Sequence, residues 1–144
     1  MTMDDCLKFA NANPVCQLAT AEGDQPHLRF MAMVTADQEG FWFATLTPKA
    51  MSRQLHKNPK VEVCFFNNAQ NPAEWRVLYV VGKAEFVKDE ARLGKVLKER
   101  AAVGQIIGRP IDPYGELFRV RSGEARFWTL KESLDEEKLE RVRF

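Results

Sequence analysis

One segment of the sequence, TLTPKAMSRQL, combines hydroxyl and cationic side chains with the start of a predicted helix. The apolar run at residues 40–44 precedes it, Pro48 suits the first turn of a helix, and Asn58-Pro59 suits its end. Such a strand-to-helix junction directs free backbone N–H groups and the positive end of the helix dipole toward one point. The segment therefore suits an anion, and the side chains around it are Thr45, Thr47, Lys49, Ser52 and Arg53.

Composition and charge describe an ordinary globular protein. The chain has 144 residues, of which 45% are hydrophobic and 28% are charged, and we expect a single domain over residues 1–144. The formal net charge of +1 gives no general attraction to nucleic acid or to an acidic membrane surface. No apolar run approaches the ~20 residues of a membrane span, and the acidic N-terminus is unlike a signal peptide. We therefore expect a cytoplasmic protein without a membrane or nucleic-acid partner.

The cysteines and histidines form no recognisable metal or nucleophile motif. Cys6, Cys16 and Cys64 are widely spaced and include no CxxC pair, so we expect neither a zinc site nor a disulfide framework. His27 and His56 are isolated from one another, and no Ser-His-Asp arrangement can be argued. The three thiols are expected to be reduced packing residues.

Alternating apolar residues and turn signals predict about six strands. The links between the first three strands are too short for crossovers, so these strands should form an antiparallel meander. The fifth strand contains Gly82, which indicates a bulge or bend. The expected strands span residues 15–22, 27–36, 41–45, 60–67 and 75–87, followed by a hairpin of 117–120 and 124–130 around Ser122-Gly123.

Capping signals and apolar spacing predict a few helices between these strands. They span residues 6–11 after a cap at Asp4 or Asp5, 48–57, 89–101, and a last helix that begins at a capping box of Ser133 and Glu136. Residues 103–114 contain two glycines and two prolines and are expected to form a loop with up to one turn of helix. The whole pattern predicts a mainly β protein, built as a small antiparallel barrel with a few helices. Because side chains fill the interior of so small a barrel, a ligand should bind on its outer surface or between subunits.

The order and spacing of several short motifs resemble the pyridoxamine 5′-phosphate oxidase-like flavin-binding family, in the short form that includes nitroimidazole-resistance and general-stress proteins. The motifs are LRFM at residues 28–31, FAT at 43–45, KAMSRQL at 49–55, NPKV at 58–61, VGKAE at 81–85 and SGEARFW at 122–128. The resemblance covers about residues 5–131. It implies a six-stranded antiparallel split barrel of the FMN-binding type, and a homodimer with FMN at the subunit interface.

The resemblance also implies which residues contact the cofactor. Arg29 would bind the FMN phosphate, while the backbone and side chains of the next strand residues would lie along the flavin. Two adjacent basic residues of the true oxidases correspond to Ala50 and Met51, which shifts the expected phosphate site toward Lys49. The full set of implied contacts is Arg29, Met31, Ala32, Met33, Ala44, Thr45, Lys49, Ser52 and Gln54, together with Trp75, Arg76 and Trp128 from the other subunit.

The expected reaction follows from the implied cofactor. The sequence has no GxGxxG dinucleotide fingerprint, which favours FMN over FAD. We expect an FMN-dependent oxidoreductase that reduces a small organic acceptor with a nicotinamide donor, and no catalytic side chain is assigned. The Arg-x-His pair of the true oxidases is replaced here by Arg126 and Trp128, so oxidation of vitamin B6 is not expected. Two alternatives stay open, namely a flavin carrier or sensor without turnover, and a ligand-free or haem-binding split barrel.

Overall fold

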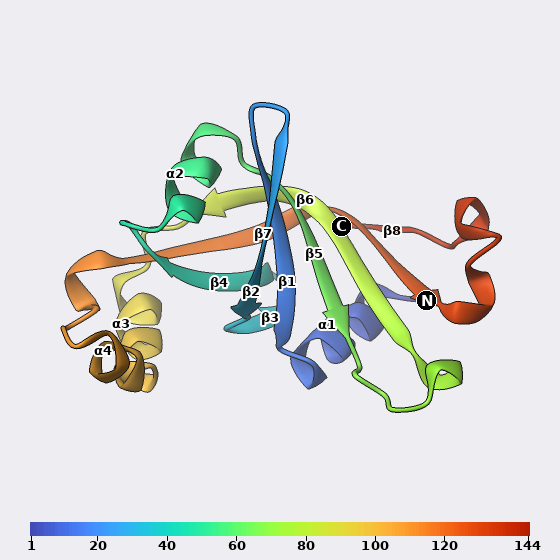
Figure 1. The fold of residues 1–144 in the computed structure, drawn as a ribbon, viewed down its shortest axis with the longest axis horizontal. Helices are drawn as coiled ribbons and strands as arrows, with labels where there is room; N and C mark the ends of the chain where they lie inside the picture. Colours follow the sequence, from blue (N-terminus) through green and yellow to red (C-terminus); the bar gives the residue numbers. More distant parts are fainter.

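The computed structural model describes residues 1–144 and consists mainly of one curved antiparallel sheet (Figure 1). Eight strands form it, in the order β2-β1-β5-β6-β7-β4-β3 with β8 added to β7. The prediction of six strands was therefore slightly low. The strands are β1 (Val15–Glu22), β2 (Gln25–Ala32), β3 (Thr35–Asp37), β4 (Gly40–Leu46), β5 (Lys60–Phe66), β6 (Arg76–Phe86), β7 (Gly115–Thr129) and β8 (Val142–Arg143).

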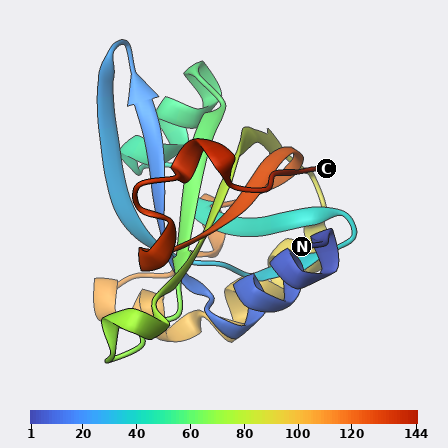
Figure 2. The same ribbon diagram turned by 90° about the vertical axis from the view of Figure 1, so that its right-hand side faces the viewer.

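Four helices lie around the sheet, and none is long and apolar enough to cross a lipid bilayer. They are α1 (Met3–Ala12), α2 (Ala50–Lys57), α3 (Glu90–Glu99) and α4 (Ala101–Ile107). Figure 2 shows the β1–β2 hairpin projecting beside α2, with α1 toward the opposite end of the molecule. The apolar sides of α1 and α2 complete the core at these two ends, through Leu7 and Leu55 among others.

The segment between β2 and β4 closes the sheet into a barrel. The expected continuous strand 27–36 is wrong, because β2 ends at Ala32 and pairs with β1, whereas β3 pairs with β4. Between them, the N–H of Met33 donates to Pro14 at 2.8 Å and the N–H of Val34 donates to Trp42 at 2.8 Å. The chain thus changes neighbours at this point, and the other edge of β2 pairs with no strand. The predicted meander is present only as two separate hairpins.

Side chains fill the interior of the barrel, as its size predicts. Leu18, Val63 and Leu78 are fully buried on three adjacent strands. On β2 the expected alternation is confirmed, since Met31 is buried while Phe30 is 74% exposed. A ligand site must therefore lie outside this core.

The expected hairpin at Ser122-Gly123 is wrong, because β7 is one continuous strand that pairs with β6. The register shifts between Gly82 and Ala84, which confirms the irregularity predicted at Gly82. Gly123 lies opposite Gly82, and a Cβ atom on Gly123 would overlap the carbonyl oxygen of Val81. These glycines permit a close approach of two bent strands, and neither has the positive φ of a tight turn.

The helix boundaries differ from the predicted ones at several ends. Thr2, not Asp4 or Asp5, caps α1 in a capping box with Asp5, and α2 begins two residues after Pro48. The predicted end of α2 at Asn58 is confirmed. The helical part of this segment is longer than the single turn expected, because α4 spans residues 101–107 and ends at Gly108, which adopts the left-handed conformation.

The last predicted helix is absent. Thr129 and Glu132, not Ser133 and Glu136, form the capping box, and only the short 3-10 turns Leu130–Glu132 and Glu136–Lys138 follow. Leu134 is 98% exposed, so this segment buries too little apolar surface to stabilise a longer helix.

Candidate functional site

A small cavity lies where the junction after β4 meets the two helices that follow β6. Its volume is about 110 Å³. Ala44, Thr45, Leu46 and Lys49 form one side, and Val96, Leu97, Arg100, Val103 and Ile111 form the other. The structure thus places three of the predicted site residues, Ala44, Thr45 and Lys49, around one cavity, as their adjacent positions in the sequence suggested.

Thr45 is the unusual member of this cavity. It is 4% exposed, and its hydroxyl oxygen is buried without any hydrogen-bond partner. A buried hydroxyl without a partner costs about 1–3 kcal/mol of stability. The inward position of Thr45 follows from the alternation of β4, in which Phe43 also faces the core. Thr45 therefore places an unsatisfied polar atom at the wall of the cavity.

Two cations lie at the same cavity. Lys49 is exposed at the N-cap position of α2, whose first turn contains no acidic residue. Arg100 lies at the joint of α3 and α4 and donates to the backbone oxygen of Ala32 at 2.7 Å. Neither Lys49 nor Arg100 forms an ion pair, and burial lowers the pKa of Arg100. The cavity is therefore electropositive.

Arg100 is a residue that the sequence reasoning missed. It lies in a charged helix, where an arginine is ordinarily a solvated side chain. Only the three-dimensional contact with Ala32 connects it to the unpaired edge of β2.

Arg29 and Gln54 form a second cluster. It includes a residue of α2, and neither Arg29 nor Gln54 lines the cavity. Arg29 donates to the oxygen atoms of Thr20 and Gln54, each at 2.7 Å. Its other acceptors are the carbonyls of Leu18 and His27 at 3.3 Å, so no carboxylate neutralises it. Burial lowers the pKa of Arg29. Arg29 is thus a partly desolvated cation held only by neutral groups.

Ser52 faces away from the cavity. Its hydroxyl donates to the carboxylate of Glu116 on β7, and the other carboxylate oxygen lies 2.7 Å from His56 Nε2. The His56 ring stacks on Phe86 at 3.8 Å. This cluster fastens α2 to β6 and β7.

The three residues expected from the other subunit lie together, away from the cavity of their own chain. Trp75 donates to the carbonyl of Ala69 at 2.9 Å, and the Arg76 guanidinium lies 3.9 Å from the centre of the Phe127 ring. Trp128 lies opposite Val77, and its indole N–H is buried without a partner. None of the three lines the cavity.

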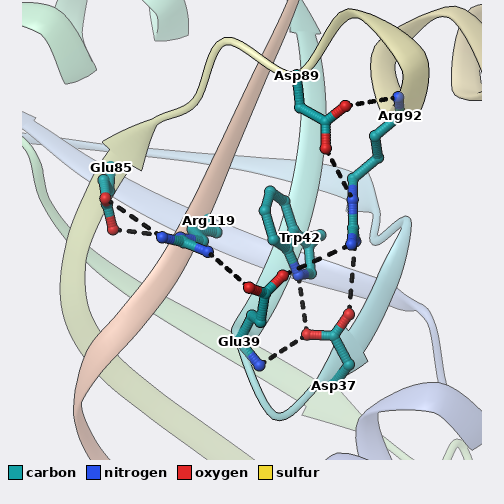
Figure 3. Close-up of polar contacts among 7 residues, drawn as sticks. All are labelled: Asp37, Glu39, Trp42, Glu85, Asp89, Arg92 and Arg119. Atoms are coloured by element: carbon teal, nitrogen blue, oxygen red, sulfur yellow. Dashed lines mark hydrogen bonds and ion pairs between the residues drawn. The ribbon is translucent and has the colours of Figure 1, made fainter.

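A network of charges around Trp42 holds α3 against β4 (Figure 3). The Arg92 guanidinium lies 4.0 Å from the centre of the Trp42 ring, and that of Arg119 lies 5.0 Å away. The indole N–H donates to Asp37 at 3.0 Å. Arg92 also pairs with Asp37, Glu39 and Asp89, while Arg119 pairs with Glu39 and Glu85. The network fixes the helix that supplies Val96, Leu97 and Arg100 to the cavity.

The potential metal ligands are dispersed, and the thiols are partly or fully buried. No group of three His, Cys, Asp or Glu side chains is arranged to hold a metal ion. Burial raises the pKa of Cys6 and Cys64, and raises that of Cys16 to about 12. These thiols are therefore poor nucleophiles at neutral pH.

Comparison with solved structures identifies the architecture as a split barrel. A NimC/NimA family protein from Clostridium acetobutylicum has a TM-score of 0.74 at 21% identity, over 99% of this chain and 92% of that chain. General stress protein 26 from Bacillus anthracis has a TM-score of 0.73 at 18% identity, over 100% of both chains. A protein from Mesorhizobium loti described as FAD-binding has a TM-score of 0.68 at 18% identity, over 88% of this chain and 92% of that chain.

Sequence comparison places the chain in a family. No curated protein matches it significantly. The family described as pyridoxamine 5′-phosphate oxidase, however, matches residues 2–129, which confirms the resemblance noted in the motifs. The chain therefore belongs to the pyridoxamine 5′-phosphate oxidase family.

Proposed function

We propose that this chain is a cytoplasmic flavoprotein that binds FMN between the unpaired edge of β2 and the end of β4. The observation that carries this proposal is the buried hydroxyl of Thr45, which has no partner and belongs to a residue that lines a cavity beside two cations without ion pairs. A phosphate or ribityl oxygen would satisfy the hydroxyl, and the cations would balance the phosphate charge. The family and the FAD-binding relative support a flavin as the source of these groups.

The residues of the chain fit this cofactor in a particular way. Lys49 and the backbone N–H groups at the start of α2 would hold the phosphate, with Thr45 beside them. The outer edge of β2, which ends at Ala32, has no neighbouring strand, so backbone groups there can bond the flavin ring beside Met31 and Met33, although the N–H of Met33 already donates to Pro14. Arg29 and Gln54 would support the phosphate from beside α2. Arg100 supplies a positive charge that the basic residues replaced by Ala50 and Met51 would otherwise provide.

FMN is preferred over FAD, although one relative is described as FAD-binding. The proposed anion site is a single short turn with two cations, which matches one phosphate better than a diphosphate. The sequence also has no dinucleotide fingerprint.

A homodimer is part of the proposal because one outer face of the barrel is unusually apolar. Phe30 is 74% exposed and Val15 is 63% exposed on adjacent strands. They border a groove of about 530 Å³ that also includes Phe66 and Val77. A second copy of the chain would bury this face. The adjacent residues Trp75, Arg76 and Trp128 would then be placed to reach the partner's flavin.

The proposed activity is reduction of a small organic acceptor with a nicotinamide donor. Bound FMN would supply the hydride and electron transfer. The protein would bind and orient the reactants, and the apolar side chains of Val96, Leu97, Val103 and Ile111 would exclude water from one side of the site. A flavin carrier without turnover is the second candidate. It is favoured by the lining of the cavity, which contains no carboxylate, histidine, cysteine or tyrosine that could transfer a proton.

The absorbance spectrum of the purified protein tests the proposal first. An oxidised-flavin spectrum, with FMN identified by mass spectrometry after release, would support it. A Soret band would support haem instead, and FAD as the sole flavin would refute the choice of FMN. Oxidation of NADH or NADPH by the loaded protein, with and without small organic acceptors, then separates an oxidoreductase from a carrier.

A further inference from the structure

A larger depression lies on the outer face of the barrel, apart from both the cavity at Thr45 and the groove beside Phe30. It is a groove of about 730 Å³ that crosses β1, β5, β6 and β7 over the bend of the last two strands. Its volume falls within the range of small-molecule sites. No residue lines both this groove and the cavity at Thr45.

Two lysines lie next to each other in this groove, and no carboxylate neutralises their charge. Lys60 on β5 pairs directly with Lys83 on β6 in the strand register, and both are exposed. Like charges directly opposite each other destabilise an antiparallel pair. Neither lysine forms an ion pair with any carboxylate. The sheet therefore contains an unfavourable positive pair that the fold itself does not require.

Two carboxylates, Glu62 and Glu124, also line the groove, but these and the neighbouring Glu85 are already paired with arginines. Glu62 pairs with Arg126 at 3.3 Å, and Glu85 pairs with Arg119 at 3.2 Å. Glu124 pairs with Arg141 at 2.8 Å. Because arginines already neutralise the two carboxylates of the groove, the two lysines keep an unbalanced positive charge.

The floor of the groove suits the close approach of a small molecule. Gly82 and Gly123 lie opposite one another there and present backbone instead of side chains. Ser122 is exposed, and its hydroxyl makes no hydrogen bond. Val81, which is 38% exposed, adds an apolar wall. Cationic donors, a hydroxyl and an apolar side chain therefore surround the exposed backbone of the two glycines.

We propose that this groove binds a small organic phosphate, at a site distinct from the cavity at Thr45. Lys60 and Lys83 bind the phosphate as charge-assisted donors, and the apolar part of the ligand lies over Val81 and the two glycines. Binding of the phosphate also relieves the repulsion between the lysines. In the free protein this repulsion remains in the sheet. Functional sites often contain such a departure from the rules of local stability.

Adenosine monophosphate is a suitable probe, with adenosine as the probe that lacks the phosphate. Amide NMR spectra of the FMN-saturated protein report the response of Gly82, Ser122 and Gly123 directly. If the protein does not bind FMN, the same titration is run without it, so failure of the flavin proposal does not affect this test. We expect saturable shifts of these amides with adenosine monophosphate, and much smaller shifts with adenosine.

Variants then assign the phosphate contact. The double variant Lys60→Gln, Lys83→Gln should weaken binding by at least about tenfold, the loss expected for hydrogen bonds to a charged group. Lys88→Gln removes another exposed lysine without an ion pair and should leave binding unchanged. Equal binding by the double variant, or shifts that do not saturate, would overturn the proposal. Shifts confined to residues around Thr45 would do the same, because they would place the ligand in the other cavity.

Discussion

Thr45→Val is the substitution that most directly tests the candidate site. Valine keeps the shape and β-branching of threonine, so the packing of β4 should be preserved. In the free protein, the change removes a buried hydroxyl that has no partner. We therefore expect the free energy of unfolding to rise by about 1–3 kcal/mol, the cost of leaving such a group unsatisfied.

The same substitution should have the opposite effect on cofactor binding. If the hydroxyl donates to a phosphate oxygen, its loss removes a hydrogen bond to a charged group, worth about 1.5–3 kcal/mol. FMN should then bind roughly 10- to 150-fold more weakly. A substitution that stabilises the free protein and weakens the cofactor separates a binding role from a structural one.

Two measurements decide the outcome. Urea unfolding of the flavin-free protein gives the change in stability, and quenching of flavin fluorescence gives the affinity for FMN. Thr47→Val is the matched control, since Thr47 lies in the same segment but is exposed. A loss of stability for Thr45→Val would show that the hydroxyl has a partner in the folded protein. A gain of stability with unchanged FMN affinity would show that the cavity does not hold the cofactor.

The remaining predictions concern the phosphate, α3, the buried thiol and the dimer. Lys49→Ala should weaken FMN by about 1.5–3 kcal/mol in titrations but riboflavin much less, whereas Lys57→Ala at the far end of α2 should change neither; equal losses for both flavins would refute a phosphate contact. Arg92→Ala should lower the free energy of unfolding in urea by about 1–2 kcal/mol, because it removes an arginine that stacks on an indole and pairs with three carboxylates; an unchanged midpoint would mean that the network adds no stability. Burial raises the pKa of Cys16 from 9.0 to about 12, so the folded state retains a proton that the unfolded chain releases, and stability should fall as the pH rises from about 9 toward 12. Cys16→Val should reduce the slope of stability against pH in unfolding experiments, and an identical slope would contradict the raised pKa of Cys16. Phe30→Glu should convert a dimer into a monomer in light scattering at micromolar concentration, and a persistent dimer would place the interface elsewhere.

Local signals in the sequence were enough for several elements. β1 follows the predicted boundaries, Asn58 ends α2, and Gly82 marks the irregular pairing of β6. Each of these features depends on neighbouring residues, such as an alternating pattern, a helix cap or a glycine in a strand. The motif that places Ala44, Thr45 and Lys49 around one cavity is also contiguous in the chain.

Features set by distant contacts were predicted poorly. Ser122-Gly123 has the composition of a turn, but its close approach to Gly82 on β6 makes it part of one long strand. Residues 27–36 alternate as one strand, but closure of the barrel makes the chain change partners at Met33 and Val34. Neither outcome is encoded in the local pattern, because both depend on which strand lies alongside.

The candidate site also has one part that depends on local sequence and one part that depends on distant contacts. Only the local part could be predicted from the sequence. The junction after β4 is local, and the anion site proposed there could be inferred from residue types alone. The other wall comes from α3 and α4, about fifty residues later, which contribute Arg100 and the apolar residues near it. Turns that could bind an anion occur in many proteins. A turn that lies near an apolar wall and the unpaired edge of β2 would accept a narrower range of ligands. Because Arg100 already donates to Ala32 on that edge, the position of α3 determines where this positive charge lies. The contact between α3 and β2 should therefore govern which ligand the split barrel accepts.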